Sequence, residues 1–306
     1  MYPKVLFFIV SLAMASSLNA QSIRVEGHVL DAITKEPIPY VNLSFLNTLK
    51  GTSTDEAGHF FIDISEVLLE KDVHISSLGY EEKVLKGKIL SETKNIYLEE
   101  ESFELDEVVL SEIWGDSEVL NPISSYSLTS GFSSSSTPWV LALYFPNLGA
   151  KQKVIEKVMV FFQQQSGKLK SESKFRLRVY DIDMDTGAPG EDVLRENVIL
   201  NTQEGDTHVS VDLSEYKIIV PRDGVYIGLE WLFIPYNWYR STTEDPITKQ
   251  KYVEDRFAPT FGGVYSGNFN YKTMIYGMGT WSPFRVVSRG NDKSFIPAIS
   301  LKYLIQ

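Results

Sequence analysis

The stretch Ile23-Arg24-Val25-Glu26-Gly27-His28-Val29 alternates apolar and polar residues, as a strand with one buried face does. Alternation returns in Val41-Asn42-Leu43-Ser44-Phe45, and turn residues separate the two stretches. Further short strand-like runs follow at 59–64, 73–76, 83–85 and 96–98. About seven short strands at roughly ten-residue spacing predict an antiparallel β-sandwich or barrel.

Four motifs in this part of the chain also occur in a characteristic order. They are Val25-Glu26-Gly27-His28-Val29-Leu30-Asp31, Thr34-Lys35-Glu36-Pro37-Ile38-Pro39-Tyr40-Val41-Asn42, Gly51-Thr52-Ser53-Thr54-Asp55-Glu56-Ala57-Gly58-His59-Phe60 and Ser77-Leu78-Gly79-Tyr80. Over about ninety residues they resemble the carboxypeptidase-regulatory-like domain, a transthyretin-like seven-stranded sandwich. Leu105-Asp106-Glu107-Val108-Val109-Leu110 resembles the segment that closes this domain in many exported proteins of Gram-negative bacteria, often ahead of the plug of a TonB-dependent receptor.

The resemblance implies a non-catalytic accessory module and brings no peptidase activity with it. The histidines, His28, His59, His74 and His208, have no partner at a zinc-ligand spacing such as H-E-x-x-H. We therefore expect them to be ordinary core or surface residues. Gly51 and Gly58 are expected to bracket a hairpin, because a positive φ is cheap only for glycine.

Residues 1–20 predict a secretory signal peptide, with a buried core helix as the alternative. Lys4 precedes an apolar run at 5–15, which is too short to span a hydrocarbon core of ~30 Å, and Leu18-Asn19-Ala20 ends in a small residue. We expect cleavage before Gln21 and no transmembrane helix in the mature chain. Because the sequence has no cysteine, we do not expect a lipoprotein. We expect an exported protein that is periplasmic, outer-membrane-associated or secreted.

Charge divides the mature chain into two parts. Residues 21–112 hold 19 acidic and 8 basic side chains, whereas residues 113–306 hold 21 and 20, so the net charge of −11 arises in the first part. The alternating pattern also ends near Glu112, and a serine-rich stretch follows at 133–137. These shifts predict a β-sandwich at 21–112, a linker or lead-in at 113–137 and a second domain at 138–306.

Strand patterns dominate the second domain as well. Strand-like runs lie at 139–145, 154–162, 175–180, 209–213, 225–231 and 295–303. No long segment has the helical period, so the whole chain is predicted to be all-β, with a larger jelly-roll-like sandwich as the second domain. An outer-membrane barrel is the alternative, which uneven strand lengths and irregular loops disfavour.

One candidate site follows the strand predicted at 175–180. Asp181, Asp183 and Asp185 alternate ahead of Gly187, with Asp192 at the twelfth position, like the start of a calcium loop. The glycine lies one position late, and position twelve is not glutamate. A solvated turn is the simpler interpretation, and calcium is the only cofactor that the sequence suggests.

A second candidate site lies in an aromatic-rich stretch. Residues 226–303 contain 17 aromatic side chains in 78 positions. Rings on loops stack on sugars or grip peptides, whereas rings on strands usually pack into the core, which explains most of these residues. The candidates for a ligand groove are Trp231, Tyr236, Trp238, Tyr239 and Trp281.

The leading hypothesis is a non-enzymatic exported envelope protein that binds or scaffolds a protein or glycan partner. The acidic segment at 99–107 favours a basic partner surface, although a solvated strand edge is its commoner role. The acidic balance disfavours nucleic acid as a partner. No catalytic residue is assigned, because no G-x-S-x-G motif occurs.

Two alternatives stay open at this stage. The first is a hydrolase accessory or a carboxylate-dependent hydrolase, because a catalytic carboxylate pair forms in space and leaves no sequence motif. The second is a degenerate relative of a TonB-dependent receptor, for whose barrel too few residues remain after the first domain.

Overall fold

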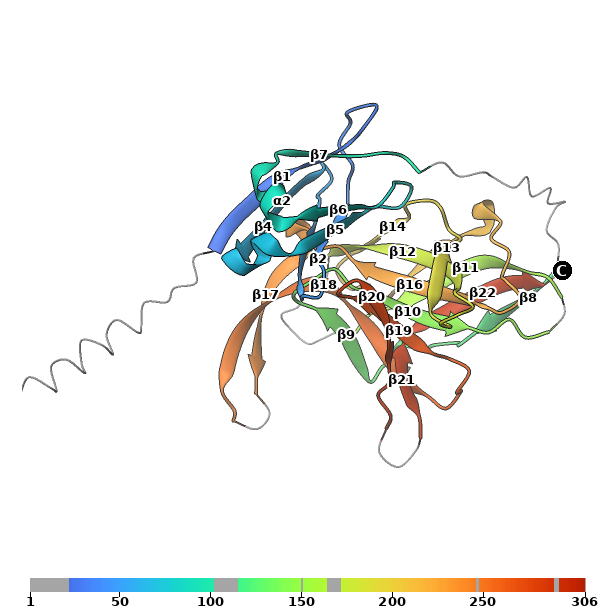
Figure 1. Ribbon diagram of the computed structural model, residues 1–306. Coiled ribbons are helices and arrows are strands. Elements are labelled where there is room, and N and C mark those ends of the chain that lie inside the picture. Colours follow the sequence, from blue (N-terminus) through green and yellow to red (C-terminus); the bar gives the residue numbers. More distant parts are fainter. Residues whose placement is uncertain are drawn as a thin grey trace, which may run out of the picture.

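The computed structural model describes residues 22–101, 115–149, 151–163, 172–245, 248–288 and 292–305. They form two β-rich parts that lie against each other, a first module at 22–101 and a second region at 115–305 (Figure 1). The all-β prediction is confirmed, since α2 (Gly87–Glu92) is the single α-helix of the described residues. No helix in these ranges is long and apolar enough to cross a membrane. The predicted signal at 1–20 and the segment at 105–110 lie outside them.

Two sheets pack against each other in the first module. One sheet has the order β4 (His59–Ser65), β1 (Ser22–Asp31), β7 (Asn95–Leu98), and the other has the order β3 (Lys50–Ser53), β2 (Asn42–Phe45), β5 (Asp72–Ser76), β6 (Lys83–Lys86). The alternation in the sequence is the burial pattern of β1, in which Val25 and Val29 are buried and Glu26 between them is exposed. Phe45 and Phe60 fill the space between the sheets. A 3-10 helix, η1 (Glu66–Glu70), follows β4.

The two glycines expected to bracket a hairpin have different roles. Gly58 has a φ of 68° in the turn before β4, and a Cβ there would lie 2.8 Å from Pro37 Cβ. Gly51 does not have a positive φ; a Cβ on it would lie 2.7 Å from Pro138 Cδ in the second region. The expectation is therefore wrong for Gly51, which permits close contact between the two parts.

The described residues of the second region form three sheets. The largest has the order β13 (Pro189–Asp192), β12 (Ser173–Ile182), β16 (Val225–Trp231), β10 (Val140–Phe145), β19 (Thr273–Gly277), β20 (Thr280–Phe284), with β14 (Ile199–Thr202) also paired to β12. The second has the order β15 (His208–Asp212), β11 (Lys153–Phe161), β22 (Ile299–Ile305), β8 (Asp116–Leu120). The third has the order β17 (Trp238–Glu244), β18 (Lys251–Ser266), β21 (Ser294–Pro297), with β9 (Ser130–Ser134) also paired to β18. Short 3-10 turns are η2 (Ser125–Ser127), η3 (Ser214–Tyr216) and η4 (Pro235–Asn237).

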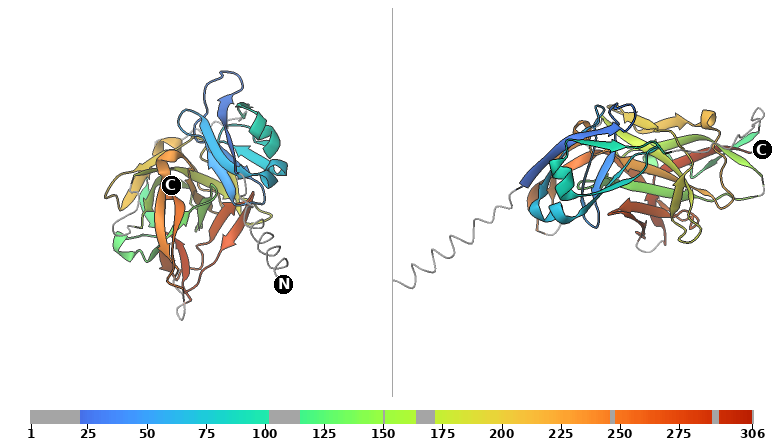
Figure 2. Two further views of the ribbon diagram at one scale, coloured as in Figure 1. Left: turned by 90° about the vertical axis from the view of Figure 1, so that its left-hand side faces the viewer. Right: turned by 45° about the horizontal axis from the view of Figure 1, so that its top comes forward.

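The main core lies between the largest sheet and the other two. Leu143, Leu177 and Leu229 from the largest sheet pack in one cluster with Val158 of β11 and Leu301 of β22. Burial of each such side chain contributes about 1.5–3 kcal/mol relative to exposure. Figure 2 shows the first module at one end of the molecule, far from the end of β22.

The predicted linker at 113–137 contributes strands to the second region. β8 pairs with β22, and β9 pairs with β18. The linker prediction is therefore wrong for 116–120 and 130–134. β8 is an exposed edge strand without an alternating apolar pattern, and β9 is composed mainly of serine and glycine, so neither carries the usual strand signal.

A buried ion pair of the second region forms hydrogen bonds with the first module. Arg176 on β12 and Glu230 on β16 are opposite each other in register, with side chains 0% and 1% exposed and an Nη1–Oε1 distance of 2.8 Å. Arg176 Nη2 donates to the carbonyl oxygen of Tyr40 at 2.7 Å, and Asn42 Nδ2 donates to Glu230 Oε1. Since buried charges are costly unless all their polar atoms are paired, the first module completes the environment of this pair.

Other contacts strengthen the same junction. Tyr40 has a left-handed φ of 59°, which is uncommon outside glycine, and its buried ring packs with Leu232 and Ile234. The N–H of Ser53 donates to the carbonyl of Phe233 at 3.3 Å, and the N–H of Phe233 donates to Ser53 Oγ at 3.0 Å. Backbone and side-chain bonds together make the first module and the second region one unit.

Replacing Arg176 with leucine should destabilise the protein by about 3–5 kcal/mol, because Glu230 keeps its buried charge and loses its main partner. Urea unfolding followed by tryptophan fluorescence measures the change. Arg24→Leu is the control, because Arg24 pairs with Asp63 at 3.0 Å on the exposed surface and should leave the midpoint near that of the wild type. Equal midpoints for both variants would show that the buried pair does not stabilise the junction.

Candidate functional site

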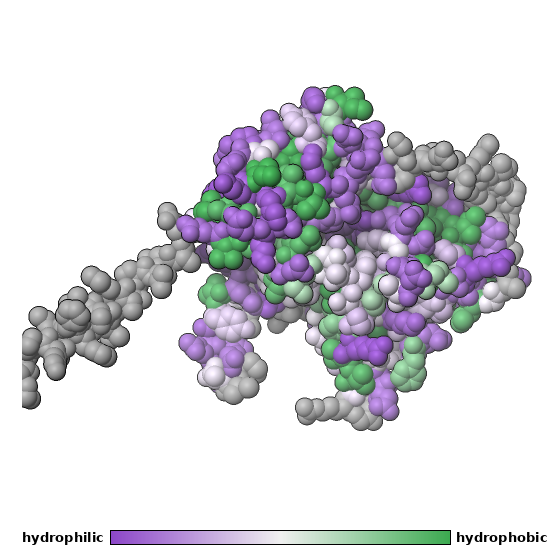
Figure 3. Space-filling model, viewed as in Figure 1, coloured by the Kyte–Doolittle hydropathy of each residue, from purple (hydrophilic) through white to green (hydrophobic). Residues whose placement is uncertain are grey.

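A cleft lies where the two parts meet and has a volume of about 440 Å³ (Figure 3). We call it the interdomain cleft. One wall comes from β2, β5, the segment that follows β5, and Glu101; the other comes from β10, β12, β13, β16, β19 and β20. Its side chains are those of Asn42, Ser44, His74, Ser76, Ser77, Leu78, Tyr80, Glu82, Glu101, Pro138, Val140, Arg178, Tyr180, Glu191, Asp192, Arg195, Glu230, Tyr276 and Trp281.

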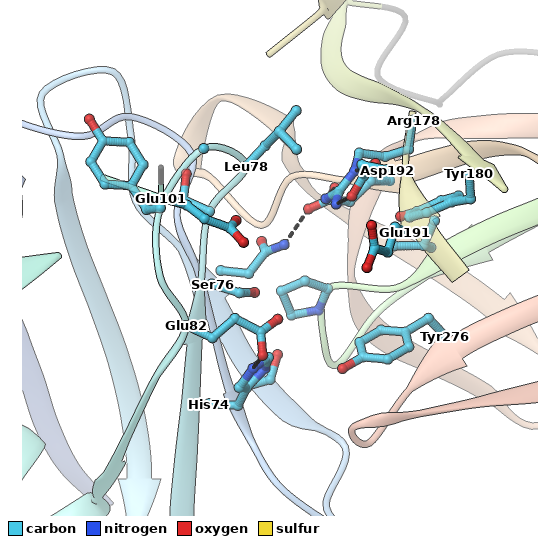
Figure 4. A pocket seen from close by; sticks show the side chains of 18 of the residues that line it. His74, Ser76, Leu78, Glu82, Glu101, Arg178, Tyr180, Glu191, Asp192 and Tyr276 are labelled. Atoms are coloured by element: carbon cyan, nitrogen blue, oxygen red, sulfur yellow. Dashed lines mark hydrogen bonds and ion pairs between the residues drawn. The ribbon is translucent and has the colours of Figure 1, made fainter. Parts of the chain in front are cut away.

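The first wall is built from the motif Ser77-Leu78-Gly79-Tyr80. Gly79 has a φ of 84°, so the chain turns sharply after β5 at a position that suits glycine. The turn is held by two backbone bonds, from Glu101 N to Gly79 O at 2.9 Å and from Glu81 N to Glu99 O at 2.9 Å. This local structure brings Glu82 and Glu101 to the same side of the cleft (Figure 4).

His74 and Glu82 form a polar pair on this wall. His74 Nε2 lies 2.8 Å from Glu82 Oε2, and the side chain of Glu82 is 69% exposed. The hydrogen bond from His74 lowers the pKa of the Glu82 carboxyl, against a smaller opposing effect of burial. Glu82 therefore presents a negative charge to the cleft at neutral pH.

The second wall contains a charge network that continues from the junction. Arg178 Nε donates to Asp192 Oδ1 at 2.7 Å, its Nη2 also pairs with Asp192 Oδ2, and its Nη1 donates to Glu230 Oε2 at 3.1 Å. Burial alone would raise the pKa of Glu230, but the charges of Arg176 and Arg178 outweigh burial and lower it. The positive charges of Arg176 and Arg178 thus balance the negative charges of Asp192 and Glu230 at this wall.

Three aromatic rings complete the second wall. Trp281 lies edge-on to Tyr180, with centroids 5.5 Å apart, and is tilted against Tyr276 at 5.2 Å. The guanidinium of Arg178 lies 5.2 Å from the centroid of Tyr180. Figure 4 shows Tyr276 reaching across the cleft toward the side of His74 and Glu82. The cleft therefore offers ring surface beside charged hydrogen-bonding groups.

The aromatic candidates do not form one site. Trp281 lines the interdomain cleft, whereas Trp238 is 41% exposed and lines a second cavity of about 580 Å³ beside β3, β4 and β17. Tyr236 is exposed beside Lys174. The prediction that Trp231 and Tyr239 bind a ligand is wrong, because both side chains are buried. Trp231 Nε1 donates to the carbonyl of Pro259 at 2.8 Å.

The candidate calcium residues stabilise a turn between β12 and β13. Asp183 Oδ1 accepts from the N–H of Asp185 at 2.9 Å, Asp181 Oδ1 accepts from the N–H of Glu191 at 2.7 Å, and Asp192 pairs with Arg178. The described part of the chain has no group of three or more acidic or histidine side chains that could hold a metal ion. Calcium binding here stays a prediction without a ligand cluster to support it.

Sequence reasoning missed the charged residues of the second wall. Arg176 and Arg178 alternate with apolar residues in β12, which is the pattern of a solvent-exposed face. The signal in the sequence was Glu230, a single glutamate within the apolar run at 225–231. All seven residues of β16 are buried, and a glutamate in such a strand needs a buried partner.

Comparison with known proteins identifies the class of the first module. Residues 25–110 match the family model of the CarboxypepD_reg-like domain, so this module is a carboxypeptidase-regulatory-like domain, as the motifs suggested. A search of curated protein sequences found no match. Among solved structures, the cysteine protease and lectin-like domains of Cwp84, a surface layer associated protein of Clostridium difficile, match with a TM-score of 0.38 and 9% identity. The match covers 93% of this chain and 59% of that one.

Acid should destabilise the protein in part through Glu230. A lowered pKa in the folded state means that the stabilisation is complete above the unfolded pKa of about 4.3 and is lost as the pH falls through the folded pKa. Urea unfolding at a series of pH values from 6 to 2 should show a steeper loss of stability below about pH 4 for the wild type than for Glu230→Gln. Parallel curves for the two proteins would contradict this assignment.

Proposed function

We propose that this protein is an exported, non-enzymatic binding module that holds a glycan in the interdomain cleft. The observation that supports this function is a cavity of about 440 Å³ that combines the rings of Tyr276 and Trp281 with exposed carboxylates from both parts. Sugars are recognised by this combination, because their flat apolar faces stack on rings while their hydroxyls pair with charged groups. A binding or scaffolding role also fits a carboxypeptidase-regulatory-like module.

The state of the carboxylates favours binding over hydrolysis. A general acid needs a raised pKa and access to the substrate. The pKa values of Glu82 and Glu230 are both lowered. Burial raises the pKa of Asp192, but Arg178 binds both of its oxygens. Asp192 and Glu230 are therefore suited to holding the second wall, and the exposed Glu82 is suited to bonding a ligand.

Trp281→Ala should weaken glycan binding by about tenfold, because it removes a ring surface from the cleft. A glycan array with the full chain identifies binders, and titration calorimetry measures their affinity. Trp238→Ala is the matched control, since it removes an exposed tryptophan from the second cavity and should leave the affinity unchanged. Tyr276→Phe tests the hydroxyl alone and preserves the ring.

Three results would overturn the proposed function. An array with no binder would exclude a glycan, and equal losses for Trp281→Ala and Trp238→Ala would place the ligand elsewhere. Turnover of glycoside or peptide substrates, lost on Glu82→Gln, would replace the binding role with a hydrolase.

Export should yield a mature protein that begins at Gln21. Fractionation of the producing cells, followed by N-terminal sequencing of the purified protein, measures both location and cleavage. Recovery of the chain from the cytoplasm with an intact N-terminus would contradict export.

A further inference from the structure

We propose that the interdomain cleft selects a sugar that carries a protonated amine, a hexosamine with a free amino group, over a neutral sugar. Because it names the ligand class of the same cleft, this selectivity rests on the proposed function. It adds a charge requirement that ring stacking and hydroxyl bonding do not impose.

The cleft has more negative than positive charge. Among the residues that the structure describes, five carboxylates line it, and the two that belong to the network, Asp192 and Glu230, are compensated by Arg176 and Arg178. The other three are Glu82, Glu101 and Glu191, all of them exposed. Arg195 also lines the cleft, and His74 is bonded to Glu82. Even with Arg195 and a protonated His74 counted, the carboxylates are in excess.

The excess charge lies on both sides of the ligand space. Glu82 and Glu101 come from the first module, and Glu191 stands on the opposite wall with Tyr276 (Figure 4). Carboxylates that face a common space repel one another, and a cation placed between them relieves the repulsion. An ammonium group bound there satisfies both walls at once.

The rings favour the same ligand. The faces of tyrosine and tryptophan carry negative electrostatic potential, so they attract a cation as well as the apolar face of a sugar ring. A hexosamine presents both features on one small ring. Acetylation of its nitrogen removes the charge while it keeps the sugar ring, so the acetylated sugar is a close neutral comparison.

Calorimetric titration of the full chain at pH 6 and low salt tests the preference directly. The probes are a tetramer of β-1,4-linked glucosamine and the fully N-acetylated tetramer. We expect the amine form to bind at least about tenfold more tightly, and the advantage to shrink to about threefold or less in 0.5 M NaCl, because salt screens exposed carboxylates.

Charge-neutral variants locate the preference in the cleft. The double variant Glu82→Gln/Glu191→Gln should bind the two tetramers within about threefold of each other. Glu66→Gln/Glu70→Gln is the control, because these exposed residues of η1 lie outside the cleft lining and give the same change in net charge. The control should keep the full preference, and its unfolding midpoint and that of the double variant should match the wild type.

Each of the other outcomes would overturn the amine preference, the sugar assignment or the proposed function. Equal or tighter binding of the N-acetylated tetramer overturns the amine preference and leaves glycan binding intact, as does a glycan array whose binders are all neutral. Binding of tetralysine as tightly as the glucosamine tetramer shows that charge alone is recognised, which overturns the sugar assignment. Failure of every glycan to bind overturns the proposed function itself.

Discussion

The buried pair of Arg176 and Glu230 is the constraint on which the relation between the two parts depends. Neither side chain reaches solvent, and the polar atoms of the pair are completed by groups of the first module. Without Tyr40 and Asn42 the pair would have unpaired polar atoms, and without the pair the Tyr40 carbonyl would lose its donor. The junction is therefore specific in position, since an apolar contact alone tolerates sliding and a hydrogen-bonded charge pair does not.

The interdomain cleft is a consequence of that fixed position. Its walls belong to the first module and the second region, so its shape depends on how these two parts lie against each other. The charge network serves both purposes: Arg176 reaches into the first module, while Arg178, two residues later on the same face of β12, turns toward the cleft and holds Asp192. Rigid support of this kind keeps binding groups in place before a ligand arrives, which lowers the entropy that binding costs.

Sequence reasoning was most successful where a residue's environment follows from its neighbours in the chain. The strands of the first module and their alternation were predicted because each has one face toward a core and one toward water, as β1 illustrates. It failed for β8 and β9, whose exposed or serine-rich edges have no apolar pattern. It also failed for Trp231, because the sequence of an aromatic-rich stretch does not indicate which of its rings are buried in the folded protein.

The sequence by itself determined an all-β chain with a carboxypeptidase-regulatory-like module, because period-two alternation, turn glycines and short motifs are local properties. It also identified the motif at 77–80 and the acidic excess of the first part, but it did not predict that both contribute to the interdomain cleft. Only the tertiary structure decided that Arg176 and Glu230 are buried, that Trp281 and Trp238 lie in separate cavities, and that Glu82 and Glu191 face each other across one cleft. The physical reason is that burial and charge balance depend on surfaces contributed by residues more than a hundred positions away, which no local pattern records.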